Sequence, residues 1–188
     1  MSTKKIVQRY VVPASIVVFF IVMVAIYFMV PIFKSGIEKG HMIASDINQL
    51  KEIFKRIDET CHIVDFDFQQ NPINFLTIRK GGFVGSEIGP MNIVHPDKWE
   101  GPYLPDNPTM DGKEYMVVRT KIGHFITPGN GVELPNGKVI GKDIILDEDA
   151  NIGCMMFDED ALMYRKQPMA AHILVRGPRI GPRLPVHY

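Results

Sequence analysis

Residues 10–33 read YVVPASIVVFFIVMVAIYFMVPIF and carry no charged side chain. About 20 predominantly apolar residues are enough for an α-helix to cross the hydrocarbon core of a bilayer. The alternative is the apolar region of a cleaved signal peptide, which is only about 7–15 residues long and precedes a small-residue cleavage site. Pro31, Ile32 and Phe33 do not fit such a site. The sequence therefore predicts a transmembrane helix at 10–33 that stays in the protein.

The flanks of this stretch predict its orientation. Lys4, Lys5 and Arg9 precede it without an acid, whereas residues 34–40 mix both signs. Cytoplasmic flanks carry the excess of Lys and Arg. We therefore expect residues 1–9 to be a cytoplasmic tail of a single-pass protein, in contact with membrane lipid. The chain after the span is expected on the far side, which is the periplasm if the membrane is a bacterial inner membrane.

Residues 34–61 predict a helical extension of the span. Its apolar residues recur in steps of four and three, which places them on one helical face: Ile43, Ile47, Leu50, Phe54 and Ile57. This face packs either on the sheet of the same domain or on a neighbouring copy. Gly36 and Gly40 have the spacing that lets membrane helices approach closely. The same junction, residues 34–40, is alternatively a hinge or break in the helix.

Residues 62–175 predict an α+β domain, with the helix packed on a small antiparallel sheet. Short alternating segments at 64–68, 115–120, 124–127 and 171–175 predict strands, as do 143–146 and 154–157. Asn136-Gly137 between two apolar runs is typical of a tight hairpin. Asn71-Pro72 predicts the start of a short helix through Ile78. Residues 176–188, rich in Pro and Arg, predict either a disordered end or an extended arm on a partner.

Composition excludes several classes of function. The formal net charge is zero, which gives no indication of nucleic-acid binding. Two cysteines, Cys61 and Cys154, are too few for a disulfide-rich scaffold and have no zinc-site spacing. Outside the cytoplasm they are candidates for one disulfide, and the alternative is two separate buried thiols. No nucleophile motif or HExxH motif is present, so we expect no enzymatic activity.

A turn-rich loop carries the large aromatic rings Trp99 and Tyr103, with Gly101-Pro102 fixing a bend between them. This pattern predicts a structural loop locked by its rings, and a carbohydrate or peptide groove is the alternative. The segment WEGPYLP, residues 99–105, resembles the Trp-x-Gly-Pro-Tyr-Leu segment of major pseudopilins. The order of basic leader, apolar helix, helical extension and antiparallel sheet also resembles type IV pilins and type II secretion pseudopilins.

The resemblance implies a structural subunit that acts by helix packing and surface display, in a pilus-like or type II secretion-like assembly with copies of itself or other subunits. No glycine precedes the apolar stretch and no glutamate lies inside it, so the chain looks like a divergent relative that is not cleaved. These absences favour the alternative, a permanently anchored accessory subunit of another envelope complex, such as a respiratory or photosynthetic one.

The acidic residues 143–160 are the candidate metal site. Asp147, Asp149 and Asn151 alternate as in calcium loops, and Asp158 stands at the twelfth place. Ile152 replaces the glycine that an EF-hand loop needs at its sixth place. Major pseudopilins bind calcium in a loop near the end of their sheet, so the resemblance implies calcium here. The alternative is a solvated acidic loop without a cofactor.

Overall fold

The computed structural model describes residues 12–83 and 85–176, with side chains described at 17–27 and from residue 36 onward. The chain divides into two compact units, Met1–Glu38 and Lys39–Tyr188, and helix α2, Val12–Cys61, supplies residues to both. The two expected tails, residues 1–9 and 176–188, lie outside the described residues except for Arg176. Residues 34–40 are helical within α2, so the expected break at this junction is wrong.

The predicted membrane anchor is also wrong. In the described part of the chain, no helix is both long enough and apolar enough to span a bilayer. The transmembrane helix at 10–33, the single-pass topology and the inner-membrane, periplasmic location are therefore corrected.

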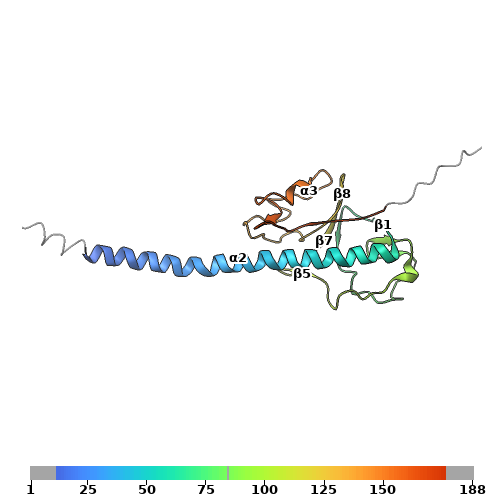
Figure 1. Ribbon diagram of the computed structural model, residues 1–188, viewed down its shortest axis with the longest axis horizontal. Helices are drawn as coiled ribbons and strands as arrows, with labels where there is room; N and C mark the ends of the chain where they lie inside the picture. The colour runs from blue at the N-terminus through green and yellow to red at the C-terminus, as the bar shows by residue number, and fades with distance from the viewer. Residues whose placement is uncertain (1–11, 84, 177–188) are drawn as a thin grey trace, which may run out of the picture. The chain divides into compact units, whose positions relative to one another are not determined.

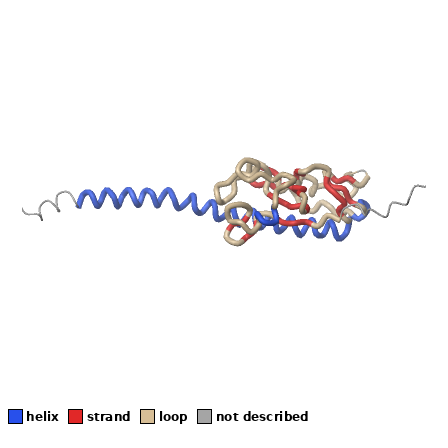
Figure 2. Tube along the Cα trace, turned by 90° about the horizontal axis from the view of Figure 1, so that it is seen from above, coloured by secondary structure: helices blue, strands red, loops and turns tan. Residues whose placement is uncertain are grey.

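The second unit is α+β, with several small antiparallel sheets beside the C-terminal half of α2 (Figures 1 and 2). A four-stranded sheet has the order β11-β8-β7-β2, and a three-stranded sheet has the order β1-β4-β3. The strands of the first sheet are β11 (Ala171–Ile173), β8 (Gly123–Thr127), β7 (Met116–Thr120) and β2 (Gln70–Pro72). Those of the second sheet are β1 (Ile63–Phe66), β4 (Met91–Ile93) and β3 (Glu87–Ile88). Two hairpins, β5-β6 (Thr109–Met110, Lys113–Glu114) and β9-β10 (Met163–Tyr164, Gln167–Pro168), and two short helices, η2 (Pro96–Lys98) and α3 (Ile152–Met155), complete it.

The apolar face of α2 forms one wall of the core. The five residues predicted from the period are each at most 1% exposed: Ile43, Ile47, Leu50, Phe54 and Ile57. Phe54 packs against Phe66 of β1 and Phe75, with ring centroids 6.2 and 6.1 Å apart. This face therefore contacts the chain's own sheet-bearing unit and is not open to a neighbouring copy.

Helix α2 ends in a left-handed cap, and its last turn carries a buried carboxylate. His62 has a φ of 55°, and its backbone N–H donates to the Asp58 carbonyl at 3.1 Å. The Asp58 side chain, itself buried, accepts a hydrogen bond from the Ile63 N–H at 3.1 Å and from Arg176 Nε at 3.0 Å. One carboxylate thus joins the helix end, the first strand and the last described residue.

Two local predictions need correction, the first of them because long-range pairing overrides it. Asn71-Pro72 begins no helix, since Gln70–Pro72 pairs as edge strand β2 with β7. Asn71 is fully buried, and its side-chain amide donates to the Phe68 carbonyl at 2.6 Å. Pro72, which lacks an N–H, is tolerated because β2 is an edge strand. Residues 154–157, predicted as a strand, instead lie in and directly after α3, which Asn151 caps.

Close packing at Gly40 occurs within the chain. A Cβ at this position would collide with the ring of Tyr164, which therefore rests directly on α2. His41 Nδ1 also lies 3.0 Å from Gln167 Oε1 of the same hairpin. Gly36, the other residue of the spacing, is half-buried in α2.

The contact at Gly40 predicts a loss of stability on substitution. We expect Gly40→Val to lower the free energy of unfolding by about 1–3 kcal/mol, because the added side chain forces the Tyr164 ring away. Urea denaturation followed by circular dichroism measures this. The control is Ser45→Val, at an exposed helical position. Gly137→Val is unsuitable, because Gly137 has a φ of 80° and a valine there would strain the backbone. Equal losses in both variants would contradict the packing role.

Candidate functional site

Trp99 anchors the loop that lies beside α2. Its side chain is fully buried, and its Nε1–H donates to the Ile78 carbonyl at 3.0 Å. The ring packs edge-on against Tyr103, with centroids 4.8 Å apart, and against Phe83 at 6.2 Å. Since a buried indole N–H needs a partner, the Ile78 carbonyl fixes the ring's orientation.

Gly101 lets the loop approach the chain closely. A Cβ there would collide with both the Ile78 carbonyl oxygen and Trp99 Nε1, so only glycine fits. The Gly101 carbonyl accepts from the Lys80 N–H at 3.1 Å, and the peptide bond to Pro102 is cis. Trp99, Gly101, Pro102 and Tyr103, the four residues singled out for a structural loop, are thus brought together.

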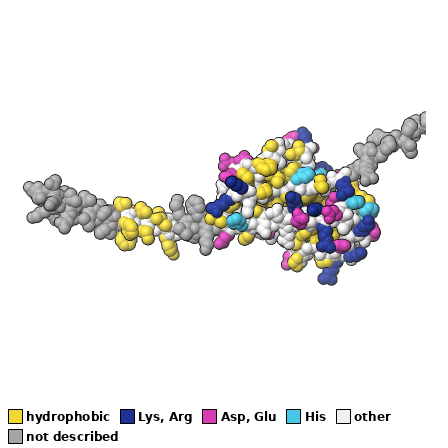
Figure 3. Space-filling view, viewed as in Figure 1, with side chains coloured by type: hydrophobic (Ala, Val, Ile, Leu, Met, Phe, Trp, Pro, Cys, Tyr) yellow, Lys and Arg dark blue, Asp and Glu magenta, His cyan; other side chains and the backbone are white. Residues whose placement is uncertain are grey.

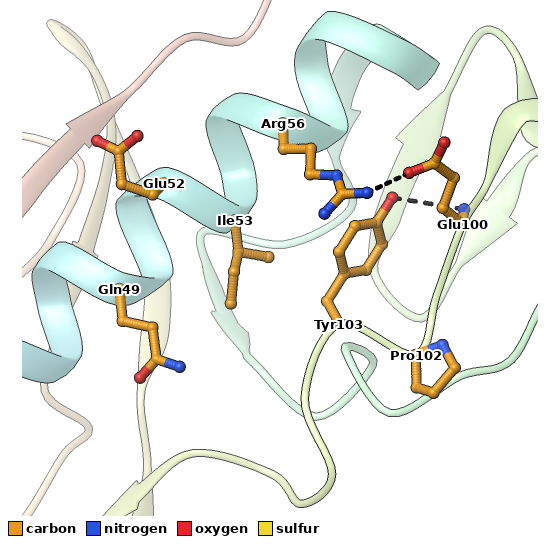
Figure 4. A pocket seen from close by; sticks show the side chains of 7 residues that line it. All are labelled: Gln49, Glu52, Ile53, Arg56, Glu100, Pro102 and Tyr103. Carbon is orange, nitrogen blue, oxygen red and sulfur yellow. Dashed lines mark hydrogen bonds and ion pairs between the residues drawn. The ribbon is translucent and has the colours of Figure 1, made fainter.

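A pocket of about 440 Å³ lies between this loop and α2 (Figure 4). Gln49, Glu52, Ile53 and Arg56 line it from the helix; Glu100, Pro102 and Tyr103 line it from the loop. Figure 4 shows Ile53 and Gln49 on the helix side, with Tyr103 reaching toward Arg56. Arg56 donates to Glu100 Oε2 at 2.6 Å, and its guanidinium carbon lies 5.9 Å from the Tyr103 ring centroid. The guanidinium thus ties the loop to the helix.

A second pocket, of about 400 Å³, continues along the same flank of α2 and shares Gln49 with the first. Its other lining residues are Asp46, Leu50, Leu104, Pro105, Asp106, Asn107, Pro108 and Thr109. Asp46 accepts a hydrogen bond from the buried Tyr115 hydroxyl at 2.8 Å, which holds the carboxylate in place. We call the two pockets together the α2 groove.

The electrostatics of the α2 groove favour binding over proton transfer. Burial raises the pKa of Tyr103, and burial followed by the Asp46 hydrogen bond raises the pKa of Tyr115. Both phenols are therefore neutral near pH 7 and are poor proton donors. Four carboxylates line the groove against the single guanidinium of Arg56. The groove offers negative charge, hydrogen bonds and aromatic surface.

The sequence did not reveal this groove. Glu52 and Arg56 have the i,i+4 spacing of an ion pair within a helix, but Arg56 pairs with Glu100, 44 residues away. The signal that could have indicated it is Glu100, an acid inside the WEGPYLP segment.

The candidate calcium ligands are used in local turns. Asp147 Oδ1 accepts from the Asp149 N–H at 3.1 Å, and Asp149 pairs with Lys121. Asn151 Oδ1 accepts from the Cys154 N–H at 3.0 Å, and Asp158 Oδ1 accepts from Asp160 N–H at 2.9 Å. Within the described residues, no three acidic, His or Cys side chains converge as metal ligands.

The candidate disulfide does not form. Cys61 is buried at the end of α2, whereas Cys154 is exposed in α3, and both thiols are free. Burial raises the pKa of the Cys61 thiol, which keeps it protonated and unreactive.

No protein-family model, no curated protein and no solved structure matches this chain.

Proposed function

We propose that this chain is a non-enzymatic structural subunit of a pilus-like or type II secretion-like assembly. In this proposal, residues 17–27 of α2 pack against the same residues of neighbouring copies, and the sheet-bearing unit displays its surface outward. The exposed apolar helix carries the proposal. The resemblance of residues 99–105 to the pseudopilin segment supports the class of assembly.

Residues 17–27 form about three turns of helix with apolar side chains on every side. The large ones, from Val17 to Tyr27, are 49–76% exposed, and yellow side chains cover this stretch in Figure 3. Complete burial of one such side chain contributes roughly 1.5–3 kcal/mol. Ten of them exceed the roughly 4–15 kcal/mol that association costs in lost freedom of motion.

The all-round exposure favours several neighbours over a single one. A lone binding groove covers one side of a helix and leaves the opposite side in water. A bundle of helices covers every side, and each copy of the chain brings an identical apolar helix. The net charge of zero means that copies do not repel one another through their overall charge.

Two double variants test this packing on opposite sides of the helix. Val18→Lys with Val22→Lys alters one side, and Phe20→Lys with Val24→Lys alters the other. We expect the wild-type chain to form large species whose mass rises with concentration in sedimentation velocity. Each double variant should shift the chain to monomer, because buried lysines leave unpaired charges between helices.

The matched control adds two lysines elsewhere on α2, as Ser45→Lys with Asn48→Lys, where both side chains are exposed. This control should assemble as the wild type does. A wild-type chain that is monomeric at every concentration would falsify the proposal. Loss of assembly in only one of the two double variants would mean a one-sided contact, which contradicts packing by several neighbours.

A further inference from the structure

The α2 groove has a charge and a surface that suit an extended basic peptide. Asp46 and Asp106 lie in one of its pockets, and Glu52 and Glu100 lie in the other. Arg56 is the one cation among the groove-lining residues, which leaves an excess of negative charge. The Tyr103 ring lines the pocket that contains Glu52 and Glu100, and aromatic-lined grooves bind proline-rich segments in extended form.

The chain itself contains a segment of the complementary chemistry. Residues 177–188 read GPRIGPRLPVHY, with two Gly-Pro-Arg steps, three prolines and no acid. In a polyproline II conformation, Arg179 and Arg183 would be about 12 Å apart. Asp46 and Glu52 are separated by about 9 Å of helical rise. The two arginines can therefore reach the two acidic pockets at once.

We propose that the α2 groove binds residues 177–188 of a second copy of this chain. This rests on the proposed function only in requiring that copies lie side by side. The bound segment places its arginines near the acidic ends of the groove and a proline on Tyr103. Each copy contributes one groove and one segment, so the contact repeats from subunit to subunit.

The position of the last described residue favours an occupant from another copy. Arg176 is held by Asp58, with Nε 3.0 Å from Oδ2, and its backbone N–H donates to the Ile63 carbonyl. Arg176 lines a third pocket, which takes Lys51, Lys55 and Asp58 from α2, whereas the α2 groove takes Gln49, Ile53 and Arg56. At about 100° per residue, these two sets lie on nearly opposite sides of the helix. The described end of the chain, Arg176, therefore lies on the side of α2 away from the α2 groove.

A fluorescently labelled peptide of residues 177–188 tests the groove directly. Anisotropy is measured with the full-length chain at 0.1 μM or below, where copies are dilute. We expect saturable binding that weakens at least about 10-fold in Glu52→Lys with Asp106→Lys. Binding should also weaken from about 0.05 to 0.5 M salt, because the paired charges are exposed and screened. A peptide with Arg179→Glu and Arg183→Glu should not bind.

The control variant is Glu133→Lys with Glu148→Lys, which makes the same charge change at exposed acids outside the groove. It should leave the affinity within about twofold. No binding, or equal weakening in the control, overturns the groove assignment. The assembly variants at residues 17–27 should bind the peptide normally, so failure here is distinguishable from failure of the proposed assembly.

A second receptor distinguishes a neighbour's segment from the chain's own. The full-length variant Arg179→Glu with Arg183→Glu carries an inactive segment but an intact groove. If the wild-type groove is empty in dilute solution, both chains bind the peptide with the same affinity, as we expect. If each groove already holds its own segment, high effective concentration makes peptide binding to the wild type about 100-fold weaker. That result would contradict binding between copies.

Discussion

The Trp99→Ala chain is expected to lose roughly 3–5 kcal/mol of unfolding free energy. The indole is fully buried, so its removal leaves a cavity beneath Tyr103 and Phe83. The Ile78 carbonyl also loses its donor, which adds the cost of an unpaired buried acceptor. The loop at 99–105 would then separate from α2, and the α2 groove would lose the wall that this loop forms.

Urea denaturation measures this loss by far-ultraviolet circular dichroism, because Trp99 is the single tryptophan and its fluorescence disappears with it. Trp99→Phe keeps a ring without the N–H and should lose clearly less. Tyr103→Phe is the matched control: the hydrogen bond that its hydroxyl accepts from the Glu100 N–H is long, at 3.4 Å, so about 0.5 kcal/mol or less is expected. A Trp99→Ala chain within 1 kcal/mol of the wild type would show that the loop does not depend on this ring.

Asp58→Ala is expected to destabilise the chain by about 2–3 kcal/mol. The substitution removes two charge-assisted hydrogen bonds, and it leaves the Ile63 N–H without its acceptor. Arg176 is about half exposed, so its freed charge returns to water and adds little further cost. The effect is therefore below that of breaking a fully buried ion pair.

The double-mutant cycle with Arg176→Ala separates the two contributions. Arg176→Ala alone leaves the buried carboxylate with one donor, so it should also destabilise, whereas adding it to Asp58→Ala should cost almost nothing more. Asp97→Ala, at an exposed position in η2, is the control and should stay within about 0.5 kcal/mol. Strictly additive single effects would contradict a direct interaction between Asp58 and Arg176.

The parts of the fold that follow from periodicity were predicted from the sequence. The face from Ile43 to Ile57 is buried, as its spacing indicated, because helical geometry alone places these residues together. The Asn136-Gly137 turn joins paired segments, with the Leu134 N–H donating to the Lys138 carbonyl at 2.7 Å. Both signals are local, so the interactions that produce them lie within one short window of sequence.

The features that the sequence did not predict depend on partners far along the chain. Asn71 has the local chemistry of a helix cap, yet pairing with β7 holds it in an edge strand. The α2 groove exists because the loop at 99–105 folds back on residues about 50 positions earlier, through Arg56 and Glu100. The apolar stretch at 10–33 predicted a membrane helix from composition alone, and the described residues do not supply one.

The two cysteines differ in exposure, so thiol labelling can report local opening of this chain. Cys154 faces water in α3, so a thiol-specific dye reaches it in the native state. Cys61 sits where the long helix meets the first strand, with no solvent contact and a raised pKa. The dye can therefore modify Cys61 only when the junction between the helix and the strand opens. The rate at which Cys61 is labelled, after Cys154, measures how often this junction opens.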